Sequence, residues 1–116
     1  MKHTISLKLN HEFRRLYNKG KTASSPFLAV YCRKTRLPVS RLGLTTGVKL
    51  GKAVRRNRVR RRLREIYRTN EHRLVPGWDI VIVARVKAVY AHYDELERSF
   101  LSIARKLDLL TAENRP

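Results

Sequence analysis

A chain of 116 residues fits one domain of ordinary size, and its 42% apolar content can fill a core, which excludes a disordered basic tail. Lys and Arg number 27 against 9 Asp and Glu, a net charge of +18 that predicts a polyanionic partner, nucleic acid before an anionic membrane surface. The single cysteine, Cys32, excludes an intrachain disulfide and a zinc site built on cysteines, and it favours a reduced, cytoplasmic protein.

The N-terminal segment has no continuous apolar region, so we expect neither a secretory signal nor a membrane span. A helix is predicted over residues 9–20, with Asn10 as its N-cap and Gly20 as its stop. Within it, apolar side chains recur at helical spacing at Leu9, Phe13, Leu16 and Tyr17.

Strands are predicted to follow this helix. Residues 21–26 begin with turn formers, and they lead into a strand over residues 27–33. A loop over residues 35–40 then precedes a second strand at about residues 41–48. We therefore expect at least two strands between the first helix and the next one.

The C-terminal half is predicted as helix, strand and helix. The helices span about residues 52–69 and 92–110, and the strand at 78–86 is an apolar run that suits burial on both faces. A polar tail follows at residues 111–116. The whole chain predicts an α+β fold: one nucleic-acid-binding domain, with helices on one small sheet and an ordered core at about residues 9–110.

The helix at residues 52–69 has two opposite faces when its residues are placed 100° apart. Val59, Leu63 and Ile66 fall in one narrow sector, which must face the sheet. On the other side, one residue per turn forms a line that we call the basic ridge: Asn57, Arg61, Arg64 and Arg68.

The residue types on this face favour nucleic acid over an ordinary solvated helix. A solvated face mixes both signs of charge, but here the single acid, Glu65, sits off the ridge. Arg also outnumbers Lys, and its planar guanidinium offers a fork of donors to phosphate and stacks on bases. We interpret the ridge as a nucleic-acid surface.

The same residues carry a family resemblance. The segment "RRNRVRRRLRE", preceded by "GLTTGVKLGKAV", is similar to the signature of the protein subunit of bacterial ribonuclease P. A looser similarity extends from about Leu9 to Leu110. The resemblance implies an αβββαβα-type sandwich, ribosomal protein S5 domain 2-like, in which the parallel strands are joined by a left-handed crossover. Such crossovers are rare, so general topology rules predict the opposite hand.

The resemblance also implies a function. The family's protein is the non-catalytic partner of a large catalytic RNA, and together they hydrolyse the 5′ leader from precursor tRNA. The RNA is expected to hold the Mg²⁺ ions and do the chemistry, with no obligate protein partner and no membrane. The residues implied to dock on RNA are Lys49, Lys52, Arg56, Asn57, Arg58, Arg60, Arg61, Arg64 and Arg68.

A second implied site is a cleft for the leader, remote from the basic helix, between the first helix and the sheet. Its matching aromatic residues are Phe13, Tyr17 and Phe27. The family's remaining strand aromatic aligns with Val30, next to Tyr31, and a shift of one residue turns a strand side chain to the other face. We include Tyr31. Core positions are the alternative for Phe13 and Tyr17, because aromatics one turn apart on a helix are often buried.

Three other functions are open to a chain this basic. A protein-catalysed nuclease needs clustered carboxylates for metal ions, but the one acidic cluster, Asp94, Glu95 and Glu97, suits the start of a helix. A structural ribosomal RNA-binding protein shares the size, charge and fold class. A DNA-binding module with Arg60–Arg68 in a major groove usually dimerises, and no spare interface helix is apparent.

Overall fold

The computed structural model describes residues 3–112. Its sheet contains β1 (Thr4–Ser6), β2 (Lys21–Ser24), β3 (Leu28–Lys34), β4 (Ser40–Thr45) and β5 (Trp78–Ala84). The helices are α1 (Asn10–Lys19), α2 (Ala53–Asn70) and α3 (Tyr93–Lys106), with short 3₁₀ turns η1 (Val48–Leu50), η2 (Glu71–Arg73) and η3 (Val86–Tyr90). The strands lie in the order β1-β4-β5-β3-β2. β4 is parallel to β1 and β5, while β3 is antiparallel to β5 and β2.

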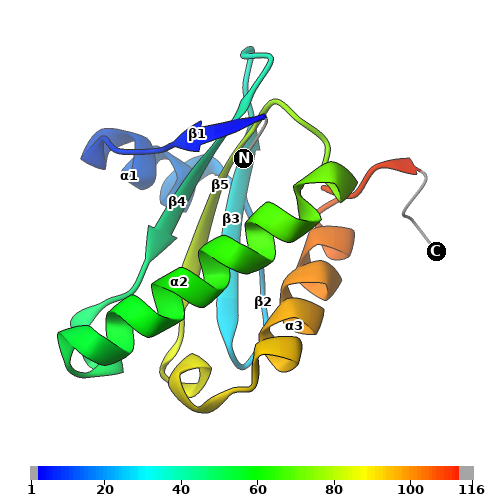
Figure 1. Ribbon diagram of the computed structural model, residues 1–116. Coiled ribbons are helices and arrows are strands. Elements are labelled where there is room, and N and C mark those ends of the chain that lie inside the picture. The colour runs from blue at the N-terminus through cyan, green and yellow to red at the C-terminus, as the bar shows by residue number, and fades with distance from the viewer. Residues whose placement is uncertain (1–2, 113–116) are drawn as a thin grey trace.

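Helices cover both faces of the sheet. α2 packs on β4, and α3 packs on β2 and β3, so together they cover the face that is in front in Figure 1. α1 contacts β3 and β5 from the opposite face. The arrangement is the predicted α+β fold, with an open mixed sheet and three helices.

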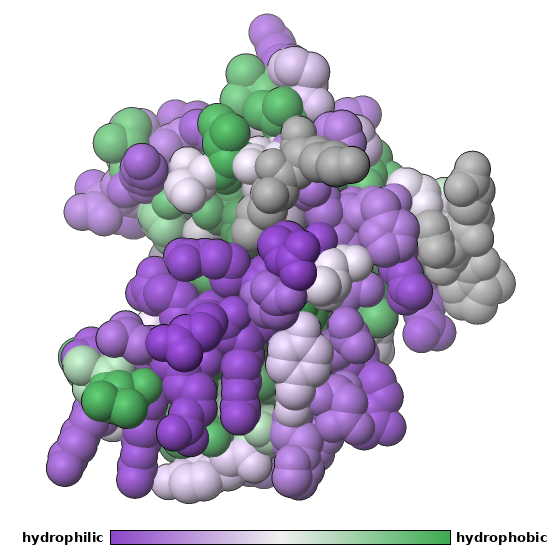
Figure 2. Space-filling view, in the orientation of Figure 1, coloured by the Kyte–Doolittle hydropathy of each residue, from purple (hydrophilic) through white to green (hydrophobic). Residues whose placement is uncertain are grey.

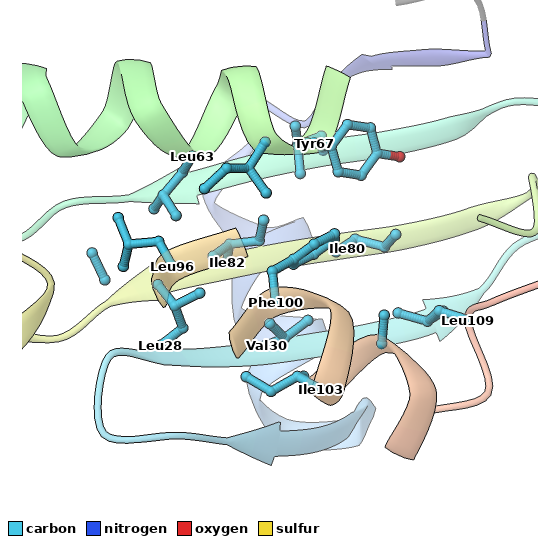
Figure 3. Close-up of a cluster of buried hydrophobic side chains, with 14 of the residues drawn as sticks. Leu28, Val30, Leu63, Tyr67, Ile80, Ile82, Leu96, Phe100, Ile103 and Leu109 are labelled. Atoms are coloured by element: carbon cyan, nitrogen blue, oxygen red, sulfur yellow. The ribbon is translucent and has the colours of Figure 1, made fainter. Parts of the chain in front are cut away.

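The larger core lies between the sheet and the helices α2 and α3 (Figure 3). Leu63 and Tyr67 of α2 and Phe100 of α3 meet there over Ile80 and Ile82 of β5. The sector predicted to face the sheet is confirmed, since its three apolar residues are at most 1% exposed: Val59, Leu63 and Ile66. The apolar residues predicted for the last helical segment are buried too: Leu96, Phe100, Ile103, Leu107 and Leu110.

A smaller core lies under α1. Three residues are buried there: Leu7, Leu16 of α1 and Val81 of β5. Phe13 and Tyr31 pack against them. Because β5 contributes to this cluster and to the larger one, the prediction of a strand buried on both faces is confirmed.

The connection from β4 through α2 to β5 is a left-handed crossover. The two strands are parallel neighbours and run downward in Figure 1, with α2 in front of the sheet and β5 to the right of β4. A right-handed connection would place β5 on the other side. The hand implied by the family resemblance is therefore the one observed.

Two edge strands were not assigned from the sequence. β1 is only three residues long and lies before the predicted ordered core. It is held by long-range contacts: Thr4 Oγ1 lies 2.9 Å from the Tyr67 hydroxyl oxygen and donates to Glu71 Oε2 at 2.5 Å. β2 occupies residues that read as turn formers, and it forms because it pairs with β3 along its whole length. Tertiary pairing overrides weak local propensity in both cases.

Several predicted boundaries were too generous. The second predicted strand ends at Thr45 and not at residue 48, because the chain turns into η1 there. Asn10 is the first helical residue of α1 instead of its cap, which is Leu9. The ordered core, in contrast, extends one residue beyond its predicted end at residue 110, because the Thr111 N–H donates to the Arg73 carbonyl at 2.8 Å. Residues 113–116 of the predicted tail lie outside the described residues.

Candidate nucleic-acid interface

The basic ridge lies on the outer surface of α2. All four of its residues are exposed, and in Figure 2 the most hydrophilic side chains gather over this helix. Arg58 is exposed as well, and Lys49 and Lys52 are exposed just before the helix. The apolar sector faces the sheet, so the guanidinium groups point away from it, as the helical spacing predicts.

The start of α2 adds to this positive surface. Its N-cap is Lys52, with no side-chain hydrogen bond to the cap, and its first turn contains no acidic residue. Free N–H groups and the helix dipole place partial positive charge at this end. Most helices offset that charge with an acid, whereas here two lysines reinforce it. The helix start therefore favours an external anion.

Some arginines of α2 already have partners within the protein. The Glu65 carboxylate accepts a hydrogen bond from Arg68 Nε at 3.1 Å, which lowers the pKa of Glu65 and partly neutralises the last residue of the ridge. The sequence had placed Glu65 off the ridge. Arg62 donates to the Ala91 carbonyl at 3.2 Å and so ties α2 to the segment before α3. Arg56 is half-buried, and its Nε is buried without a hydrogen-bond partner among the described residues.

A hollow of about 700 Å³ opens between α1 and the end of β4. Phe13 forms part of its wall and lies directly over Gly43, where a side chain would collide with the aromatic ring. Tyr17 is 39% exposed, its ring meets Tyr31 edge-on at 4.9 Å, and its hydroxyl lies 3.3 Å from Thr45 Oγ1. An exposed aromatic held in this way is a suitable platform for a nucleobase.

The structure decides between Val30 and Tyr31. Val30 is fully buried in the larger core, while Tyr31 lies on the α1 face beside Tyr17. No bulge is needed, because β3 pairs with β5 in unbroken register from Leu28 to Lys34. Phe27 is different: it packs against the larger core cluster, and it does not line the hollow that contains Phe13 and Tyr17.

The hollow is not remote from the basic helix, contrary to expectation. Arg60 of α2 lines it, and Arg60 Nη2 donates to Thr46 Oγ1 at 3.1 Å. Arg60 and Arg64 also line a neighbouring hollow of about 420 Å³, which reaches Phe13 and β1. The two predicted RNA surfaces are therefore joined through Arg60. Sequence spacing could not show this, because it depends on where β4 ends relative to α2.

Some residues of the interface escaped the sequence analysis. Asn10, Arg14, Thr45 and Thr46 line the same hollow as Phe13 and Tyr17. The position of Arg14 next to Phe13 on a helix gave a weak indication that it would line the site. No local pattern indicated the same for the two threonines. They become part of the wall because β4 ends beside α1.

The described residues contain no cluster of the side chains that most often bind metal ions. In residues 3–112, no three side chains of His, Cys, Asp or Glu come close enough together to hold one. Asp94 and Glu95 lie in the first turn of α3, and the Glu95 carboxylate accepts a hydrogen bond from the His92 N–H at 2.9 Å. Glu95 therefore caps the helix, while Glu97 accepts a hydrogen bond from Asn70 Nδ2 of α2 at 2.9 Å. A bound Mg²⁺ does not fit these residues.

Known proteins match both the sequence and the fold. The sequence model of the family "Ribonuclease P" matches residues 1–108. The chain belongs to the ribonuclease P protein family. The "Ribonuclease P protein component" of Natranaerobius thermophilus is 34% identical over 110 residues, which cover 95% of this chain and 96% of that one.

Solved ribonuclease P proteins share the fold. The protein from Staphylococcus aureus superposes with a TM-score of 0.83 at 26% identity, covering 91% of this chain and 97% of that one. The protein from Thermotoga maritima gives a TM-score of 0.77 at 32% identity, covering 84% and 92%. Membership identifies the chain as a protein component of ribonuclease P, with a role in tRNA processing, and nothing in these similarities favours the ribosomal alternative.

The contact of Phe13 with Gly43 yields a test of how this ribonuclease P protein builds its hollow. A Cβ at position 43 would lie 2.6 Å from two ring atoms of Phe13. We expect Gly43→Ala to displace Phe13 and loosen α1, at a cost of about 1–3 kcal/mol in unfolding free energy. Chemical denaturation measures this cost. Gly47→Ala is the matched control, because a Cβ there has nothing within 4 Å. Equal stability of the two variants would contradict the assignment.

Proposed function

We propose that this protein assists a catalytic RNA in removing the 5′ leader from precursor tRNA. The basic ridge and the start of α2 dock on the RNA subunit, and the hollow beside α1 holds the single-stranded leader. The RNA performs the hydrolysis and holds the Mg²⁺ ions. The complex works in the cytoplasm and requires no second protein.

The observation that carries the proposal is the pairing of two different surfaces on one small protein. One is a helix face of guanidinium groups, which suits the phosphates of a folded RNA. The other is an open hollow with Phe13 and Tyr17 in its wall, which suits unpaired bases. A leader is single-stranded where it leaves the tRNA, so the two surfaces match the two parts of the substrate complex. No helix among the described residues is long and apolar enough to cross a bilayer.

The division of labour is tested by separating the components. Cleavage of precursor tRNA is measured with RNA-free protein, with the RNA subunit alone in high Mg²⁺, and with both. We expect no cleavage by the protein, slow cleavage by the RNA, and faster cleavage by the complex. Leader removal by the RNA-free protein would refute an RNA-based reaction.

The ridge is expected to bind by phosphate contact and counterion release. With five to eight phosphates neutralised, log affinity for the RNA subunit should fall with log salt at a slope of roughly −4 to −7. Arg61→Ala and Arg64→Ala should each cost about 1–3 kcal/mol of binding and leave thermal unfolding nearly unchanged, because both residues are exposed. Arg105→Ala, exposed near the end of α3, is the control. A nearly flat salt response argues against the ridge.

Leader binding is best tested at Tyr17, which is more exposed than Phe13 and belongs less to the small core. Tyr17→Ala should weaken precursor tRNA binding to the assembled enzyme by one to two powers of ten, because stacking one base contributes ~1–3 kcal/mol. Binding of mature tRNA, which has no leader, should not change.

Two measurements separate stacking from folding. Thermal unfolding of the variant shows whether the loss of Tyr17 disturbs α1. Tyr90→Ala, which removes a 74% exposed tyrosine from η3, should alter neither affinity. If Tyr17→Ala leaves the ratio of precursor to mature affinity unchanged, the hollow does not bind the leader.

A further inference from the structure

A second hollow, of about 260 Å³, lies on the other side of α1 from the one that contains Phe13 and Tyr17. It opens between α1, the end of β3 and the start of β4. Its rim carries four exposed cations, Arg15, Arg33, Lys34 and Arg36. None of the functions argued above uses this hollow.

Both acids of this hollow pair with one guanidinium, that of Arg41. Arg41 Nε and Nη2 donate to the two Asp79 carboxylate oxygens at 2.8 and 2.7 Å, and its Nη1 forms an ion pair with Glu12. Hydrogen bonding to Asp79 raises the pKa of Arg41, so the guanidinium stays charged. In the part of the chain that the structure describes, no salt bridge involves the four rim cations. The floor therefore keeps a net charge of −1, which the four cations of the rim outweigh, so the hollow presents a net positive charge.

The loop after β3, which carries Arg36, is fixed in place, and Arg33 and Lys34 belong to β3 itself. The Thr35 N–H and hydroxyl both donate to the Gly77 carbonyl, at 2.8 and 3.1 Å. Thr35 Oγ1 also accepts a hydrogen bond from the Leu37 N–H at 3.1 Å. Arg33 of β3 pairs directly with Asp79 of β5, so the two side chains lie on the same face of the sheet. Cations on a preformed rim lose less entropy on binding an anion than cations on a mobile loop.

We propose that this hollow binds the phosphodiester backbone of the leader, beyond the nucleotides held by Phe13 and Tyr17. This inference rests on the proposed function of the first hollow. The two hollows flank one helix, with Arg14 on one side and its neighbour Arg15 on the other, so a strand leaving the first hollow reaches the second by crossing α1. The floor and rim carry no aromatic side chain, so recognition is of charge and not of base.

The test uses precursor tRNAs whose leaders grow one nucleotide at a time, bound to the assembled enzyme. We expect affinity to rise in two steps, the first as the leader fills the aromatic hollow and the second as it passes α1. Arg33→Gln with Arg36→Gln should abolish the second step, a roughly tenfold loss for long leaders only. The salt slope for long leaders should become shallower by about 1.4, the value for two phosphates on a single strand.

A matched control removes the same charge elsewhere. Arg105→Gln with Lys106→Gln, both exposed near the end of α3, should leave the second step intact. Methylphosphonate linkages in the distal part of a long leader should remove the step without any change in the protein, since they remove the phosphate charge.

Three results would overturn the inference. The first is a single step in affinity for the wild-type protein, and the second is a second step that survives in Arg33→Gln/Arg36→Gln. The third is an equal loss of affinity for short leaders, mature tRNA or the RNA subunit, which would mean that the rim binds an RNA other than the distal leader. Tyr17→Ala separates this failure from that of the proposed function. If Tyr17→Ala removes the first step while the rim variant changes nothing, only the second site is wrong.

Discussion

Strand β5 carries apolar side chains on both of its faces, and the helices are placed by that constraint. Ile80 and Ile82 are fully buried under α2 and α3, while Val81 is fully buried on the face that α1 covers. Fully burying one such side chain contributes about 1.5–3 kcal/mol, so neither face of β5 can be left in water. The left-handed crossover places α2 on one face of the sheet, and α1 covers the other face. The basic ridge and the aromatic hollow owe their relative positions to this two-sided strand.

The second organising feature is the placement of very few acids. With 9 acidic residues against 27 basic ones, the acids cannot balance the cations, and the free protein must tolerate their mutual repulsion. The acids stabilise the fold at particular points: Asp79 and Glu12 hold Arg41, Glu71 holds Thr4 of β1, and Glu95 caps α3. Among the acids, Glu65 alone pairs with the ridge in the described structure. RNA can then relieve repulsion that the protein leaves unbalanced.

Arg60 joins the two surfaces that RNA is proposed to use. It belongs to the helix that carries the ridge, yet it lines the hollow formed with α1 and bonds Thr46 beyond the end of β4. A molecule docked on α2 and a strand held beside Phe13 would therefore lie against one continuous positive surface. This proximity offers a physical route by which docking of the RNA subunit and capture of the leader reinforce each other, since both depend on the seating of α2 against β4.

The sequence alone determined the nucleic-acid partner, the α+β class, the buried sector of α2 and the basic ridge, because charge, helical spacing and apolar periodicity are local properties. It also contained the motif "RRNRVRRRLRE", which identified the family. Tertiary structure decided which strand residue lies on the α1 face beside Tyr17, since Tyr31 and Val30 point to opposite sides of the sheet. It removed Phe27 from the hollow, brought Arg60 into it, and paired β1 and β2 at the sheet edges. These outcomes depend on strand pairing, register and the packing of helices on the sheet, which the pattern of a single segment does not encode.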